Sequence, residues 1–210
     1  MSTPTDRQTP SDRILGEGLQ KLDIKLPLRV KPGLGQDDVW DRLIAVFGRW
    51  RHDEGEDLID LQDYAHIPHG PGIVLVSKRW VLSIDWRGGK PGVLLSTRRR
   101  LEGTLPERFV QATRLLLEKA ARLLNEAEMR DALTADCGEL SIAVNDRLLF
   151  PETDESDAEL RPAVTALAAK LYAGAKCDIE RLSSAARLSY RIRARGAGAT
   201  VDELTARLRG

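Results

Sequence analysis

The chain has 210 residues, of which 42% are hydrophobic and 30% are charged, as in an ordinary globular protein. This length is enough for one domain with its own hydrophobic core, so folding requires neither disulfides nor a metal. The 32 Lys and Arg balance the 32 Asp and Glu, which argues against a polybasic nucleic-acid binder and against an acidic tail. The composition also excludes collagen-like, low-complexity and disulfide-scaffold chains.

The sequence shows no feature that would direct the chain to a membrane or out of the cell. No apolar run approaches the roughly 18 residues needed to cross a bilayer, and the N-terminal residues lack the apolar core of a secretory signal. We therefore expect Cys137 and Cys177 to be free thiols in the cytoplasm, with a single disulfide between them as the alternative. Residues 1–12, rich in Ser, Thr and Pro, are expected to form a mobile tail, and residues 13–210 a single domain.

The first half of the chain begins with a strand pattern and a helix pattern. Apolar residues occupy every second position from Ile24 to Val30, which predicts a half-buried strand, and Pro27 predicts that this strand lies at a sheet edge. A helix of about four turns is expected after the Lys31–Gly35 turn, because apolar residues recur there at helical spacing. Its apolar face consists of Trp40, Leu43, Ile44, Phe47 and Trp50.

The strongest strand signal covers residues 73–86. Lys78-Arg79 divides this segment either into two strands joined by a tight turn or into one long strand with a bulge. Gly88-Gly89 is a better reversal and leads to a further strand at residues 93–95. These segments are expected to be the most apolar strands of the sheet.

Three capping boxes mark helix starts in the second half of the chain. In each, a Ser or Thr side chain can bond the amide three residues later while a Glu side chain reaches back. They lie at Thr104–Glu107, Ser156–Glu159 and Thr200–Glu203. They open a long helix reaching about residue 127, a helix that stops at Gly174, and a short C-terminal helix. Pro162 would remove a hydrogen bond from the second helix, which therefore either has an irregular first turn or starts nearer Glu159.

The remaining strand signals complete the expected fold. Residues 140–144 and 148–150 flank Asn145-Asp146 and predict a hairpin, and residues 177–182 and 187–195 predict two further strands. Adjacent hairpins with helices between them favour an α+β fold. We expect a mainly antiparallel sheet of about six to eight strands packed against three main helices, plus a short C-terminal helix.

The common nucleotide-binding and catalytic motifs are absent. There is no G-x-x-x-x-G-K-[ST] loop, and Gly16-Glu17-Gly18 lacks the third glycine and the preceding strand of a dinucleotide-binding fingerprint. H-E-x-x-H, C-x-x-C and G-x-S-x-G are also missing, so a zinc ribbon, a thioredoxin-like redox site and an α/β-hydrolase have no support. The absence of these motifs therefore favours a binding protein over an enzyme.

The most chemically dense segment is the Asp63–Gly72 loop. All three histidines lie between residues 52 and 69, among many Asp and Glu. Imidazole and carboxylate groups suit zinc, iron or manganese, so Asp63, His66 and His69 form the candidate metal site. Polar and conformationally special residues beside apolar strands are typical of binding loops, and the candidate ligand-binding residues are Tyr64, His66, His69, Gly70 and Gly72. The alternative is a polar loop that leads into a buried strand, with the histidines bonded locally.

A row of arginines lies on one side of the predicted last strand, because side chains in a strand alternate with a period of two. The row consists of Arg187, Arg191, Arg193 and Arg195. Such a row could hold phosphates bidentately, but Asp178 and Glu180 on the neighbouring strand could equally neutralise it. Aromatic residues make up only 5% of the chain, so a stacking platform for single-stranded nucleic acid is not expected.

These observations favour a non-catalytic binding or protein-interaction module that acts in the cytoplasm. Its expected partner is another protein or a second copy of the chain, with a small anionic ligand as a further option; nucleic acid and membrane are disfavoured. The first alternative is a metal-dependent enzyme in which Asp63, His66 and His69 hold the metal and Tyr64 or Asp60 moves the proton. The second alternative is phosphate or nucleic-acid binding through the arginine row. No residue pattern identifies a cofactor.

Overall fold

The computed structural model of the protein describes residues 18–53, 57–68, 70–182, 187–196 and 198–209. The strands of this part are β1 (Leu22–Val30), β2 (Leu58–Tyr64), β3 (Gly72–Ser77), β4 (Trp80–Asp85), β5 (Gly92–Thr97), β6 (Leu133–Ala135), β7 (Glu139–Val144), β8 (Cys177–Leu182) and β9 (Ser189–Ala194). The helices are α1 (Gln36–Asp53), α2 (Leu105–Asn125), α3 (Ala127–Arg130), α4 (Asp154–Leu171) and α5 (Val201–Arg209). The predicted N-terminal tail, residues 1–12, lies outside the described residues.

The strands form one sheet in the order β2-β3-β4-β5-β1-β7-β9-β8, with β6 paired to the second half of β1. Every strand pair in it is antiparallel. This architecture confirms the predicted α+β class with a mainly antiparallel sheet. Along this order β2 and β8 are the two edges, and β1 lies in the middle.

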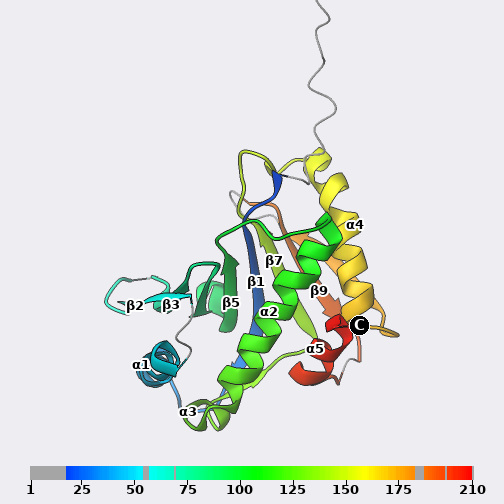
Figure 1. The fold of residues 1–210 in the computed structure, drawn as a ribbon. Helices are drawn as coiled ribbons and strands as arrows, with labels where there is room; N and C mark the ends of the chain where they lie inside the picture. The colour runs from blue at the N-terminus through cyan, green and yellow to red at the C-terminus, as the bar shows by residue number, and fades with distance from the viewer. Residues whose placement is uncertain (1–17, 54–56, 69, 183–186, 197, 210) are drawn as a thin grey trace, which may run out of the picture.

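The helices cover one face of the sheet (Figure 1). α1 packs on β2 and β3, α2 on β1 and β5, and α4 on β8, while α5 packs against α2 and α4. The period of two explains this layering: Ile24, Leu82 and Ile142 are buried on the helix side, whereas their neighbours Lys25, Ser83 and Ser141 point to the opposite face. We call that opposite face, which bears mainly polar residues, the open face.

The central position of β1 corrects the edge position predicted from Pro27. The ladder between β1 and β7 ends at Lys25, and the ladder between β1 and β6 begins at Leu28. The Pro27 carbonyl accepts a hydrogen bond from the Asp136 amide at 2.8 Å. The nitrogen side of Pro27 therefore faces the break between β7 and β6, where the missing N–H costs no ladder hydrogen bond.

Two other local predictions are corrected. The sequence pattern missed β2, because the alternation of apolar and polar residues from Ile59 to Gln62 is short and is interrupted by Asp63. Leu148–Phe150 is not a strand, and no hairpin forms at Asn145-Asp146. Instead the Asp146 carboxylate accepts the amides of residues 20 and 21 at 2.5 and 2.8 Å, which holds this segment beside the start of β1.

The tight-turn interpretation of Lys78-Arg79 is confirmed, because β3 and β4 pair across it as a hairpin. The capping box at Thr104 is confirmed as the start of α2, and the one at Thr200 as the start of α5. The middle helix differs from its prediction: α4 begins at Asp154, and the Thr153 hydroxyl, not that of Ser156, caps it at 3.3 Å. Pro162 lies inside α4.

Candidate functional site

The centre of the open face is organised by Lys25 of β1. Its stem lies across Gly92 of β5, where an added Cβ would come within 2.6 Å of Lys25 Cε. Lys25 Nζ donates to Asp85 Oδ2 at 2.9 Å and to the Lys90 carbonyl at 2.7 Å. One side chain thus ties β1 to β4 and to the loop that follows β4.

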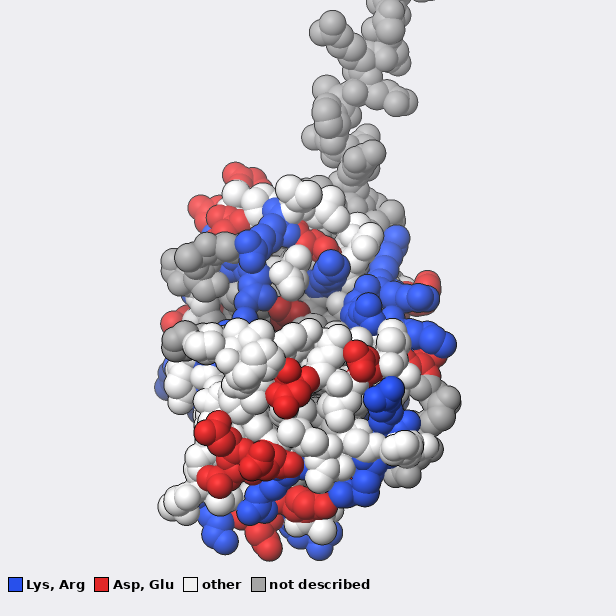
Figure 2. Space-filling view, turned by 90° about the vertical axis from the view of Figure 1, so that its left-hand side faces the viewer, with Lys and Arg blue, Asp and Glu red and all other residues white. Residues whose placement is uncertain are grey.

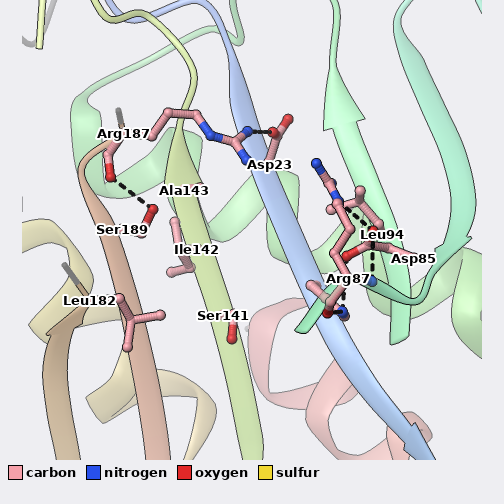
Figure 3. Close-up of a pocket in the computed structure, with 11 residues that line it drawn as sticks. Asp23, Asp85, Arg87, Leu94, Ser141, Ile142, Ala143, Leu182, Arg187 and Ser189 are labelled. Carbon is pink, nitrogen blue, oxygen red and sulfur yellow. Dashed lines mark hydrogen bonds and ion pairs between the residues drawn. The ribbon is translucent and has the colours of Figure 1, made fainter. Parts of the chain in front are cut away.

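A hollow of about 220 Å³ lies beside this clamp on the open face (Figure 3). Residues of six strands and of the loop segments beside them meet there, because the antiparallel register places them at neighbouring positions of the same face. The lining residues are Asp23, Lys25, Asp85, Arg87, Leu94, Ser141, Ile142, Ala143, Leu182, Arg187 and Ser189. The hollow is therefore a product of the tertiary fold and belongs to no single segment.

Asp85 lies at the base of the hollow and binds two cations. Arg87 Nε donates to Asp85 Oδ1 at 2.6 Å, and Lys25 occupies the other carboxylate oxygen. Burial raises the pKa of Asp85, but the hydrogen bonds from Lys25 and Arg87 outweigh burial, so the pKa is lowered. Asp85 therefore stays ionised at neutral pH and keeps the Arg87 side chain in place at the rim.

Asp23 forms the second ion pair of the hollow. Arg187 Nη1 donates to Asp23 Oδ2 at 2.6 Å, and the side chains of this pair are 25% and 9% exposed. Figure 3 shows the Arg187 side chain reaching from the start of β9 across to β1 to meet Asp23. The two carboxylates of the hollow, Asp23 and Asp85, thus each hold an arginine.

A second hollow of about 420 Å³ lies next to the loop that carries Arg87. Its lining includes Trp86, Pro27, Pro91 and Val30, with Lys90 and Glu139 also bordering it. The indole N–H of Trp86 is buried and makes no hydrogen bond within the described part of the chain. The loop therefore lies between two hollows, and each of them is lined by both charged and apolar residues.

The structure describes most residues of the predicted histidine loop. Tyr64 belongs to β2, where its hydroxyl donates to Gln62 Oε1 at 2.7 Å. Asp63, next to it, is exposed and accepts the Ala65 amide at 2.8 Å. Because neighbouring strand residues point to opposite faces, Asp63 and Tyr64 do not converge. His66 is exposed, and His69 lies outside the described residues.

Two glycines of that loop have local structural roles. A Cβ on Gly70 would come within 2.9 Å of the Ile67 carbonyl, which accepts the Gly70 amide. Gly72 has a φ of 67°, and a Cβ there would overlap the Trp40 indole. Over the described ranges, no group of three or more His, Cys, Asp or Glu side chains is arranged to hold a metal. The metal site at Asp63, His66 and His69 therefore gains no support from the residues around it.

The arginine row of β9 is paired with acids, which is the alternative left open by the sequence. Arg191 and Arg193 both contact Glu139 of β7, at 3.4 and 2.9 Å. Arg195 contacts Asp178 at 2.8 Å, and Arg187 contacts Asp23. The predicted phosphate-binding row is thus engaged within the sheet.

The two cysteines offer no reactive site. Both are free thiols in the structure, as expected. Burial raises the pKa of Cys137 to about 11 and also raises the pKa of Cys177. Both thiols therefore remain protonated at neutral pH and are poor nucleophiles.

Three charged residues in apolar strands are the only feature of the sequence that pointed to the hollow. Asp23 and Lys25 occupy the polar positions of an otherwise apolar strand, and Asp85 closes the apolar run of β4. Such charges are also typical of a solvated sheet face, so the pattern alone did not single them out.

The chain matches no protein-family model and no curated protein. No helix in the described ranges has both the length and the apolar character to span a bilayer.

Proposed function

We propose that the chain is a non-catalytic binding module that receives an acidic side chain of a protein partner in the hollow on its open face. The observation that carries this proposal is the arrangement of Arg87. Its guanidinium is oriented by Asp85 through Nε, and its side chain is 58% exposed at the rim. Its two Nη groups make no hydrogen bond within the described part of the chain, so a fixed fork faces outward for a carboxylate.

The size of the hollow favours a single side chain over a whole cofactor. Small-molecule sites commonly enclose roughly 300–1,000 Å³, whereas this hollow measures about 220 Å³. A carboxylate on a short stem fits such a volume. The larger hollow on the other side of the loop would accommodate a neighbouring residue of the same partner.

Charge supports the same partner chemistry. The hollow is lined by three basic side chains, Lys25, Arg87 and Arg187, and by two acidic ones, Asp23 and Asp85. Because both acids are held in ion pairs, the pocket suits the recognition of an anion better than proton transfer. We place this binding in the cytoplasm, where free thiols such as Cys137 and Cys177 persist.

The test is selection of peptides from a random 12-residue display library by the purified chain. The selected peptides should be enriched in Asp and Glu, and Arg87→Gln should weaken their binding at least tenfold in calorimetry. Arg99→Gln, which removes an exposed arginine outside the hollow, is the matched control and should leave affinity unchanged. Binding should also weaken with added salt, as expected for a charge-assisted contact.

Two results would overturn the proposal. One is a set of peptides without acidic enrichment, and the other is equal affinity for the parent and the Arg87→Gln variant. Titration with succinate and with inorganic phosphate identifies the small-anion alternative: tight binding of either, lost in Arg87→Gln, would replace the peptide with a free anion.

A further inference from the structure

The edge strand β2 lies four places from β1 in the sheet and so is remote from the hollow. Its ladder with β3 is regular from Asp60 to Tyr64, after an irregularity between Leu58 and Asp60. No other strand of the described part pairs with its outer side.

The backbone of β2 shows which amides face outward. The Leu61 amide donates to Asp60 Oδ1 at 2.9 Å, so it is directed away from β3. Because the hydrogen-bonding direction alternates along a strand, the Asp63 amide also faces outward. The outer edge between these two residues is therefore open to a further strand, which would replace Asp60 Oδ1 as the acceptor of the Leu61 amide.

Apolar residues gather around this edge. Within the described ranges the exposed large hydrophobic residues are Ile44, Ile59, Ile67, Leu148 and Leu149. Ile59 belongs to β2 and Ile67 to the turn after it, and they are 49% and 42% exposed.

Ile44 lies on the flank of α1 that faces away from α3. The opposite flank carries Arg49, which binds Glu126 and Glu128 beside α3. Ile44 is five residues from Arg49 and therefore about 140° around the helix from it. Figure 2, which views the molecule from the side where β2 and α1 lie, shows a broad uncharged area set with acidic side chains.

The side chains of β2 are compatible with antiparallel pairing to an identical strand. A twofold axis at Gln62 would place the Leu61 amide and carbonyl against those of Asp63 of the second copy, since both residues face outward. On the open face Gln62 would meet Gln62, whose amide can both donate and accept. Asp60 would then face Tyr64 of the second copy, and no two like charges would lie opposite each other.

The other edge strand, β8, is not compatible with antiparallel pairing to an identical strand. The Lys176 carbonyl accepts the Arg195 amide at 3.0 Å, so Cys177, Ile179 and Arg181 are the outward-facing residues. With the axis at Ile179, Asp178 would face Glu180 of the second copy. With the axis at Glu180, two glutamates would meet, and directly opposed like charges destabilise a strand pair.

We propose that two copies of the chain associate through β2, with Gln62 at the twofold axis, and form one continuous antiparallel sheet. The two open faces then lie on the same side of the joined sheet, and the exposed isoleucines beside β2 lie along the contact. The charge pattern of the two edges directs association to β2 and away from β8.

A charge-exchange pair tests this proposal. Analytical ultracentrifugation at about 100 µM, which saturates an interface of micromolar Kd, should show a dimer for the parent chain. Gln62→Glu and Gln62→Lys should each raise the dimer Kd at least tenfold, because like charges would meet at the axis. An equimolar mixture of the two variants should restore the dimer. The control pair Gln111→Glu and Gln111→Lys, on α2, should remain dimeric.

Three results would overturn the proposal: a monomeric parent chain, a dimer that is insensitive to the Gln62 substitutions, or a mixture that stays monomeric. If circular dichroism shows that the variants do not fold, hydrogen exchange of the parent chain tests the pairing instead. The Leu61 and Asp63 amides should exchange more slowly as protein concentration rises, and unchanged exchange would contradict the pairing.

Discussion

The two edges of the sheet differ in how their charges are arranged. On β8, Glu180 and Asp178 lie on the open face and pair with Arg191 of β9 and with Arg195, the residue that follows β9. On β2, Asp60 makes no ion pair within the described ranges, and its Oδ2 accepts a hydrogen bond from Gln62 of the same strand at 3.2 Å. Edge strands avoid unwanted pairing through charge. β8 carries two acids at successive positions of the open face, whereas at the corresponding positions β2 carries one acid and Gln62.

The helices beside the two edges are nevertheless held by the same kind of contact. Beside β2, the Trp50 indole of α1 donates to Glu126 Oε1 at 2.6 Å. Beside β8, the Tyr190 hydroxyl donates to Asp157 Oδ1 of α4 at 2.8 Å. In both places a carboxylate satisfies the polar atom of a buried aromatic residue, so the edges share their anchoring and differ in their charge pattern.

The largest expected effect concerns two glycines near the edges, Gly72 at the start of β3 and Gly174 before β8. Gly72 and Gly174 both have positive φ, but only at Gly72 would a Cβ overlap another side chain, that of Trp40. Gly72→Ala should lower the free energy of unfolding by about 3 kcal/mol, and Gly174→Ala by about 1 kcal/mol. Urea denaturation measures both, and equal losses would show that Trp40 does not constrain Gly72.

The two anchoring carboxylates should matter about equally. Glu126→Ala leaves the Trp50 N–H without its partner, and Asp157→Ala does the same to the Tyr190 hydroxyl. Each substitution should lower the free energy of unfolding by about 2 kcal/mol. Glu126→Gln and Asp157→Asn retain an acceptor oxygen and should lose less. A large loss of unfolding free energy at only one of the two sites would show that the two helices are not anchored in the same way.

Acid should weaken the contact between Asp157 of α4 and the Tyr190 hydroxyl. Burial raises the pKa of Asp157, but hydrogen bonds from Arg161 and Tyr190 outweigh it and lower the pKa. A carboxylate with a lowered pKa stabilises the fold fully above its unfolded value, about 3.9, and this stabilisation is lost as pH falls below it. The urea midpoint should therefore fall below about pH 4, and less steeply in Asp157→Asn than in the parent chain.

The smallest effect is expected at the β8 surface. Arg195 and Asp178 form an ion pair whose side chains are 68% and 48% exposed, and such pairs contribute little to stability. Arg195→Gln should leave the urea midpoint unchanged. A measurable fall would show that the charge pattern of β8 stabilises the fold as well as protecting the edge.

Local patterns were sufficient for most of the fold. The capping boxes at Thr104 and Thr200, the apolar face of α1 and the alternation in β1 depend only on neighbouring residues, so periodicity and hydrogen-bond chemistry predicted them. Ile44, which was predicted to belong to the apolar face of α1, is the exception, because it is exposed. Where a residue served a distant segment, the prediction was wrong. Asp146 resembled a turn residue of a hairpin, but its carboxylate binds the backbone before β1.

Hydrophobic periodicity is a local property, so it predicted the class of the fold and the buried face of strands such as β1 and β7, but not β2. Long-range strand pairing places β1 in the centre, puts β2 and β8 at the edges, and brings Asp23, Lys25, Asp85 and Arg87 into one hollow. Strand order depends on pairings between residues far apart in the chain, and no short-range pattern records them.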